Sequence, residues 1–183
     1  MKIIGITGTL GAGKGTIVDY LVKNHGYCHF SVRGFLKEQI EQRGEIVNRD
    51  SLTYTANVLR AQFGPSYIAE QLWQQAQISG RNCIIESIRT LGEVQALKAK
   101  GNFTLFSVDT DRLLRYQRVL LRGSETDHIS FETFSNNEDR ELQSADPNKQ
   151  NLTGCMALAD FHFLNNGSFQ DLFHQIDLII HTF

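Results

Sequence analysis

The sequence lacks the features of a disulfide-stabilised, membrane-spanning or polyanion-binding protein. Its three cysteines are odd in number, lack Cys-x-x-Cys spacing and fall in or near apolar segments, which predicts buried free thiols in a reducing compartment. No apolar run is long enough for a transmembrane helix, and a strand pattern starts at residue 2, where a signal peptide would lie. A net charge of −2 provides no excess of positive charge for a nucleic-acid backbone. We therefore expect a cytoplasmic protein that binds a small molecule, with no nucleic-acid or membrane partner.

The pattern along the chain is an alternation of short β-rich runs with longer helical segments. With 183 residues, of which 41% are hydrophobic, one α/β domain with a parallel sheet is expected. The predicted strands are 2–7, 27–31, 82–86, 103–108 and 160–164. The predicted helices are 14–25, 33–43, 50–63, 65–79, 91–100, 111–121 and 169–180, with Pro65 as the first residue of its helix.

The segment 8–16 reads Gly-Thr-Leu-Gly-Ala-Gly-Lys-Gly-Thr and directly follows the apolar run 3–6. Glycines let the backbone curl around an anion, so that successive N–H groups and a helix N-terminus point at a phosphate. Lys14 then spans the β- and γ-phosphates and Thr16 supplies a hydroxyl for Mg²⁺, although the strict pattern places Ser or Thr directly after the lysine. A structural turn is the alternative. The predicted nucleoside triphosphate site comprises Gly11, Ala12, Gly13, Lys14, Gly15 and Thr16.

The predicted helix from residue 111 has two opposite faces. Arg115, Arg118 and Arg122 fall within about 60° of one another, while the leucines at 113, 114, 120 and 121 gather on the opposite arc. We expect the leucine face to be buried and the arginines to bind phosphates. A solvated, charged surface is the alternative.

The third predicted strand ends at Glu86, and Arg89 follows it. Open α/β sheets bind their ligands at the carboxyl ends of the strands, which makes this a candidate catalytic position. We expect Glu86 to order Mg²⁺ through water or to orient an acceptor, and Arg89 to hold an acceptor phosphate. A helix cap with a surface ion pair is the alternative.

Two further segments are expected to complete the site. The helices predicted between strands two and three exceed the single helix of an ordinary crossover, so 33–79 is interpreted as an insertion that binds the acceptor through Arg33, Arg49 and Arg60. The polar stretch 123–154 is typical of a lid. Arg140 in this stretch either reaches the transferring phosphoryl group or belongs to an exposed, salt-bridged helix.

These residues together resemble the P-loop nucleoside monophosphate kinase superfamily, including adenylate kinases and dephospho-CoA kinases, over nearly the whole chain. The string Gly-Lys-Gly-Thr at 13–16 has the adenylate-kinase form, and Glu-Ser-Ile-Arg-Thr-Leu at 86–91 is similar to the acid-Gly-Phe-Pro-Arg-Thr-Leu segment whose arginine holds the acceptor phosphate. Arg118 and Arg122 match the pair entering the lid, of which the first packs on the donor base and the second meets phosphates. Asn166 and Gly167 resemble the turn beside the donor adenine in dephospho-CoA kinases.

The resemblance implies a three-layer P-loop fold with a five-stranded parallel sheet, and an ATP-dependent kinase. It would transfer the γ-phosphoryl group to a small phosphorylated acceptor, most simply a nucleoside or deoxynucleoside monophosphate. ATP and Mg²⁺ are the expected cofactors, with Thr16 and Glu86 as candidate metal ligands; whether the chain is a monomer or a homodimer stays open. A dephospho-CoA kinase and a regulatory nucleotide-binding switch are the alternatives.

Overall fold

The computed structural model describes residues 1–124 and 128–182, and in this part of the chain it contains one parallel five-stranded sheet with the order β2-β3-β1-β4-β5. Each strand runs parallel to its neighbours. All the predicted strands are confirmed to within about two residues at their ends. They are β1 (Ile3–Gly8), β2 (Cys28–Ser31), β3 (Cys83–Glu86), β4 (Phe103–Asp109) and β5 (Phe161–Leu164).

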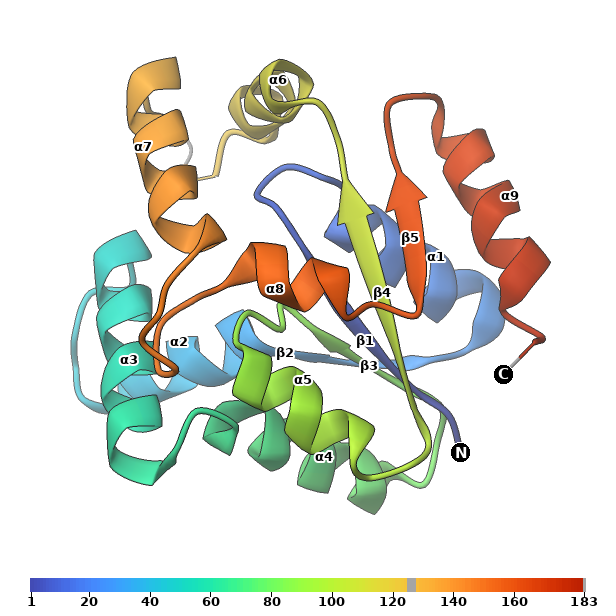
Figure 1. Cartoon of the computed structure of the whole chain (residues 1–183), viewed down its shortest axis with the longest axis horizontal. Helices are drawn as coiled ribbons and strands as arrows, with labels where there is room; N and C mark the ends of the chain where they lie inside the picture. Colours follow the sequence, from blue (N-terminus) through green and yellow to red (C-terminus); the bar gives the residue numbers. More distant parts are fainter. Residues whose placement is uncertain (125–127, 183) are drawn as a thin grey trace.

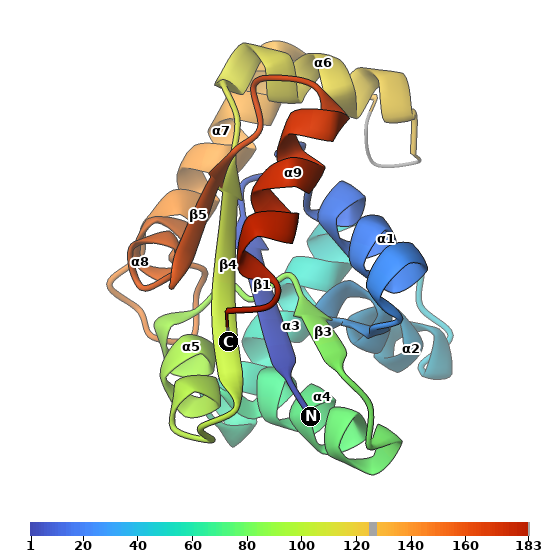
Figure 2. The ribbon, with the colours of Figure 1, turned by 90° about the vertical axis from the view of Figure 1, so that its right-hand side faces the viewer.

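Helices cover both faces of the sheet and give the predicted three layers (Figures 1 and 2). On one face lie α1 and α9, and on the other lie α4, α5 and α8, with α2 and α3 outside β2. The helices are α1 (Lys14–His25), α2 (Val32–Gln42), α3 (Arg49–Phe63), α4 (Tyr67–Ser79), α5 (Leu91–Lys98), α6 (Arg112–Arg122), α7 (Phe131–Leu142), α8 (Leu152–Ala157) and α9 (Phe169–Ile179).

Successive side chains of the central strands point to opposite faces. Ile3 and Ile85 belong to the apolar cluster beneath α2 to α5 and α8, whereas Ile4 and Ile84 belong to the cluster beneath α1 and α9. All four are almost fully buried. A parallel sheet covered on both faces needs apolar residues at every position, which explains the continuous apolar runs in the sequence.

The helix predicted to begin at Pro65 begins instead at Tyr67, with Ser66 as its N-cap residue. The carbonyl oxygen of Pro65 accepts a hydrogen bond of 3.0 Å from the Thr90 hydroxyl. A Cβ added to Gly92 would come within 2.8 Å of the Pro65 ring. Pro65 therefore fixes the turn before α4 against the start of α5.

The predicted insertion divides into two parts. Helix α4 packs on the sheet through its buried residues Ile68 and Leu72 and serves as the crossover to β3. Helices α2 and α3 are the addition, and they pack mainly on each other beside the carboxyl ends of the strands (Figure 1). A reciprocal capping box between Asn48 and Ser51 fixes the start of α3.

The predicted lid, 123–154, also divides. Helix α7 stands over the strand ends (Figure 1), but α8 lies in the core, where Leu152 and Cys155 are buried. Residues from about 151 onward are therefore not part of a lid, because their apolar side chains pack under β1 and β4. Residues 125–127 of the predicted lid lie outside the described residues.

The remaining sequence expectations concern thiols and membranes. The three cysteines are free; Cys83 and Cys155 are buried and Cys28 is half-buried. Burial raises the pKa of Cys155 to about 12, so this thiol is inert at neutral pH. Among the described residues, no helix is both long and apolar enough to cross a bilayer.

Candidate functional site

The loop 8–16 connects β1 to α1, which begins at Lys14. Gly11 and Gly13 have φ angles of 80° and 109°, a region that L-residues rarely adopt. A Cβ at Gly13 would lie 2.3 Å from the side-chain nitrogen of Asn165, which donates a hydrogen bond of 2.8 Å to the carbonyl of Ala12. The loop is thus shaped by backbone geometry and braced from the end of β5 by Asn165.

Lys14 lies inside this loop rather than in solvent. Its Nζ donates hydrogen bonds of 2.8 Å to the carbonyl oxygens of Gly8 and Thr9. Burial, followed by the charge of Arg89, lowers the pKa of Lys14 to about 8, although Glu86 opposes the change. The site therefore holds a cation in an environment that favours a nearby anion.

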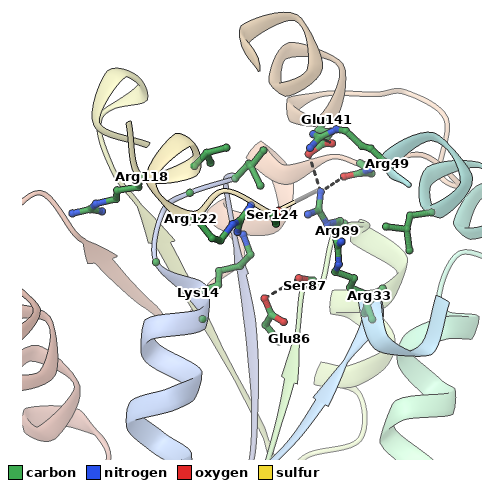
Figure 3. A pocket seen from close by; sticks show the side chains of 18 of the residues that line it. Lys14, Arg33, Arg49, Glu86, Ser87, Arg89, Arg118, Arg122, Ser124 and Glu141 are labelled. Carbon is green, nitrogen blue, oxygen red and sulfur yellow. Dashed lines mark hydrogen bonds and ion pairs between the residues drawn. The ribbon is translucent and has the colours of Figure 1, made fainter. Parts of the chain in front are cut away.

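A pocket of about 800 Å³ lies at the carboxyl end of the sheet and joins the loop to α2 and α3. Figure 3 shows Lys14 and Arg122 on one side, Arg33, Arg49 and Arg89 on the other, and Glu86 between them at the end of β3. The predicted site residues that line the pocket are Gly11, Gly13, Lys14, Gly15, Thr16, Arg33, Arg49, Arg60, Glu86, Arg89, Arg118 and Arg122.

Glu86 receives hydrogen bonds from two hydroxyl groups. The Ser87 hydroxyl donates to one carboxylate oxygen at 3.0 Å, and the Ser31 hydroxyl donates to the other at 3.4 Å. His29 Nε2 lies 3.5 Å from the second oxygen. Burial raises the pKa of Glu86, but His29 and Lys14 outweigh it and bring the pKa down to about 2. Glu86 is therefore a carboxylate at neutral pH.

Ser87 has a φ of 73° and is the one described non-glycine residue in the left-handed region. In the kinase segment that residues 86–91 resemble, a glycine follows the acid. Ser87 therefore adopts a backbone conformation that glycine would favour. Its N–H donates to the carbonyl of Ile6 at 3.0 Å, which fixes this turn to β1. Strained residues held by their surroundings are frequent at functional sites.

Arg89 and Arg49 meet at one carboxylate, that of Glu141 on α7 (Figure 3). Arg89 Nη1 donates to Glu141 at 2.8 Å and to the amide oxygen of Gln150 at 2.5 Å, and Arg49 Nη2 donates to the other oxygen of Glu141. Arg33 lines the same side of the pocket and is exposed. The acceptor-side arginines are thus brought together as predicted, but a carboxylate lies between two of them.

Arg60 lines the pocket, but its guanidinium forms an ion pair with Glu93. It is 1% exposed and donates to Glu93, which is fully buried, at 2.7 and 3.1 Å. The second oxygen of Glu93 accepts from the N–H groups of Arg89 and Thr90 at 2.8 and 3.1 Å. Arg60 therefore supports the backbone beside Arg89. Because its Nε and Nη2 already donate to Glu93, this structure does not favour acceptor binding by Arg60, which stays a prediction.

The prediction that the leucine face of α6 is buried is wrong, since Leu113, Leu120 and Leu121 are exposed. Arg115 is 5% exposed, whereas Leu121 is 87% exposed. Arg115 donates to the carbonyl of Thr110 at 2.6 Å and forms a buried ion pair with Glu138 on α7. The sequence spacing gave the correct faces but not which one packs inward, because the acid that neutralises Arg115 comes from a later helix.

Of the remaining predicted residues, Arg118 lines the pocket and Arg140 and Asn166 do not. Arg118 lines the pocket, points away from Lys14 (Figure 3) and donates to the Thr110 hydroxyl at 3.2 Å. Arg140 is exposed, is hydrogen-bonded to Asn137 and lies outside the pocket lining, which favours a surface position over the lid role. Asn166 accepts from the N–H of Asp111 at 3.0 Å.

The turn at Asn166 and Gly167 is exposed and does not line the pocket; the residue before it, Asn165, does. The sequence interpretation missed Glu141, Gln150 and Asn165 as lining residues, and His29 as a neighbour of Glu86. Asn165 directly precedes Asn166, the residue that the resemblance indicated. Glu141 and Gln150 had no local signal, since they lie in a polar stretch of similar residues.

Metal binding can be tested against the donor atoms present. The described residues contain no group of three or more His, Cys, Asp or Glu side chains placed to hold a metal ion. Thr16 and the ionised Glu86 both line the pocket and offer oxygen atoms, which Mg²⁺ prefers. The residues therefore fit a Mg²⁺ ion that arrives with a nucleotide, and its presence stays a prediction.

Comparison with known proteins shows the family of the chain. The AAA_18 family model, which describes an AAA domain, matches residues 4–143. The chain belongs to this family. A UPF0200 protein of Methanocaldococcus jannaschii, MJ1399, is 30% identical to this AAA_18 chain over 183 residues, covering 98% of the chain and 89% of the relative. The chain therefore also belongs with the UPF0200 proteins.

Solved structures show the same fold. The structure of TT1252 from Thermus thermophilus has a TM-score of 0.61 at 20% identity and covers 99% of the AAA_18 chain and 97% of that protein. Shikimate kinase from Acinetobacter baumannii, solved with shikimate, has a TM-score of 0.53 at 16% identity. The match covers 100% of this chain and 94% of the shikimate kinase. The predicted P-loop kinase-like fold is thus confirmed.

Proposed function

We propose that the protein is an ATP-dependent kinase that transfers the γ-phosphoryl group to a small anionic acceptor, most simply a nucleoside or deoxynucleoside monophosphate. The observation that carries the proposal is the arrangement of cations in one pocket. Lys14 and Arg122 lie on the loop side, Arg33, Arg49 and Arg89 on the opposite side, and the Glu86 carboxylate between them (Figure 3). Two anions bound at these clusters would face each other across the carboxylate.

On the donor side, the loop N–H groups and the N-terminus of α1 would hold the β-phosphate. Lys14 would exchange its hydrogen bonds to the carbonyls of Gly8 and Thr9 for the phosphate oxygens. Thr16 and Glu86 would hold Mg²⁺, which neutralises charge on the phosphates when bound. Arg118, directed away from Lys14, is placed to contact the base end of the nucleotide.

On the acceptor side, Arg89 and Arg49 supply the cations for the acceptor's anionic group. Val32, Leu36 and Leu52 of α2 and α3 also line the pocket and give it an apolar part. An acceptor with a flat or apolar body and one anionic end fits both parts.

Transfer then requires positioning and charge stabilisation rather than a protein nucleophile. An oxygen of the acceptor would attack the γ-phosphorus in line, and the bond from that phosphorus to the bridging oxygen would break, so that ADP leaves with the electron pair. Lys14 and Arg122 would stabilise the charge on the transferring group. Helix α7 over the strand ends would exclude water.

A dephospho-CoA kinase is the second candidate. Leu36, Leu52 and Ala56 also line the pocket and would lie along the uncharged arm of that acceptor. A regulatory switch explains the loop equally well but gives no role to a cluster of arginines on the opposite side of the pocket. The identity of the acceptor distinguishes the two kinases, and the absence of any acceptor would distinguish the switch from both.

The proposal is tested by incubating the protein with Mg·ATP and a panel of ribo- and deoxynucleoside monophosphates, dephospho-CoA and shikimate, followed by mass spectrometry. A product heavier than one panel member by one phosphoryl group identifies both reaction and acceptor. Hydrolysis of ATP at one rate with every panel member, and without phosphorylated product, would favour the switch.

A further inference from the structure

Helix α7 presents two buried carboxylates to the rest of the protein. Glu138 and Glu141 are 3% and 8% exposed and lie three residues apart, on one face of the helix. Glu138 pairs with Arg115 and Arg112 of α6, and Glu141 pairs with Arg49 and Arg89. The helix is therefore attached to the loop side of the pocket by one acid and to the acceptor side by the other.

The acceptor-side attachment has the geometry of a bound anion. Each oxygen of Glu141 accepts from a different guanidinium, one from Arg49 and one from Arg89. Charge-assisted pairs of this kind are how proteins bind carboxylate and phosphate ligands. Burial raises the pKa of Glu141, but the charges of Arg89 and Arg49 outweigh it, so the group stays ionised.

The two arginines are not structural in the way that Arg60 is. Their side chains are 25% and 21% exposed and both line the pocket, whereas Arg60 and its partner Glu93 are 1% and 0% exposed. Arg89 also keeps a second partner, because Gln150 accepts from the same Nη1 atom at 2.5 Å. Arg89 therefore remains positioned when Glu141 leaves, and its donors become available to another anion.

We propose that Glu141 fills the acceptor's anion site, defined by Nη2 of Arg49 and Nη1 of Arg89, and that the acceptor's phosphate binds by displacing it. The inference rests on the proposed function and makes Glu141 a specificity-determining residue. Only an acceptor with an anionic group offers the arginines a replacement partner; a neutral analogue leaves the ion pairs in place. Glu138 keeps α7 attached to α6 throughout the exchange.

A permanent positioning role for Glu141 predicts the opposite behaviour. If Glu141 holds Arg49 and Arg89 in place while the acceptor binds elsewhere on them, its removal weakens anion binding. If Glu141 competes with the anion, its removal strengthens anion binding. The sign of one measured change therefore decides between the two roles.

The test is calorimetric titration of inorganic phosphate and of AMP into the wild type, Glu141→Gln and the control Glu132→Gln. The control removes the same charge from an exposed position in the first turn of α7. Because the loop also binds phosphate, the component of binding that Arg89→Ala removes is assigned to the acceptor's anion site. We expect about tenfold tighter binding of both probes at this site in Glu141→Gln, since one competing charged hydrogen-bond partner is lost, and no change in the control.

Unchanged or weaker binding in Glu141→Gln, with wild-type behaviour of the control, would overturn the inference. Glu141→Asp guards against a folding defect: it keeps the charge, but its shorter side chain cannot span both guanidinia, and a smaller gain in affinity is expected. These titrations involve no turnover, so they are independent of the kinase assay. Transfer to an acceptor without the affinity gain would refute the displacement and leave the proposed function standing.

Discussion

The loop at 8–16 forms its half of the pocket mainly with backbone atoms, whereas the acceptor half uses side chains from α2, α3, α7 and the end of β3. A backbone site needs a contiguous string of residues, and Gly11 and Gly13 show why, since their φ angles of 80° and 109° exclude most side chains. A side-chain site needs only that distant segments meet. The two halves therefore differ in how mutation and pH should affect them.

The largest effect is expected at Lys14, the buried cation of the loop half. Lys14→Met removes the cation that faces the γ-phosphate, and we expect phosphoryl transfer to fall about 100- to 1,000-fold. Steady-state kinetics measure the loss. Lys23→Met, an exposed lysine in the last turn of α1, is the matched control. Comparable losses in both variants would contradict the role given to Lys14.

On the acceptor side, the next effect is on stability. Arg60→Ala removes the ion-pair partner of Glu93, whose side chain is 0% exposed, so the free energy of unfolding should fall by about 3–5 kcal/mol. Lys37→Ala, whose partner Glu41 is exposed, should change it by at most about 0.5 kcal/mol. Urea denaturation of both variants gives the comparison. Equal stabilities would show that the buried pair does not support the region beside Arg89.

The third prediction separates Arg89, expected to hold the acceptor, from Arg140, for which the sequence left a lid role and a surface position open. Arg89→Ala should raise the KM for the acceptor about 10- to 100-fold, because charged hydrogen bonds are lost, with little change in the KM for ATP. In Arg140→Ala, the KM for the acceptor and the KM for ATP should both stay within twofold of the wild-type values, since Arg140 lies outside the pocket lining. A loss in Arg140→Ala as large as that in Arg89→Ala would restore the lid-arginine interpretation.

The pH dependence should be confined to the loop half between pH 5 and 9. Because burial lowers the pKa of Lys14 to about 8, the affinity for Mg·ATP should fall about tenfold from pH 7 to pH 9. Lys14→Arg stays charged, so its profile should be flat. Glu86, with a pKa of about 2, should contribute nothing in this range. Isothermal titration at a series of pH values measures the profile.

The same shift affects stability with a definite sign. The folded pKa of Lys14 lies below its unfolded value of 10.5, so the unfolded chain binds more protons between about pH 8 and 10.5. The contribution of Lys14 to the free energy of unfolding should therefore rise with pH in this window. Lys14→Met should lack this contribution.

The smallest effect concerns Ser87. Ser87→Gly and Ser87→Ala both remove the hydroxyl that donates to Glu86, but only glycine relieves the left-handed backbone. The glycine variant should be more stable than the alanine variant by about 1 kcal/mol. Thermal unfolding compares them. An alanine variant of equal stability would mean that the turn relaxes.

The sequence predicted what local patterns determine. Each strand and the loop were predicted correctly, because an apolar run or a glycine string marks each of them. The orientation of α6 was not, since burial of Arg115 depends on Glu138, which lies 23 residues away. Glu141 was missed for the same reason: its importance comes from Arg49 and Arg89, which only the fold brings together.

The most direct test of the whole account is the fate of the γ-phosphate. ATP labelled with ³²P at the γ-position is incubated with the protein and the acceptor selected from the panel, and the products are separated. Because the two cationic sides of the pocket face each other, we predict that the label appears in the acceptor, one equivalent for each ADP formed. Label recovered as inorganic phosphate, in the same amount with or without acceptor, would contradict the account.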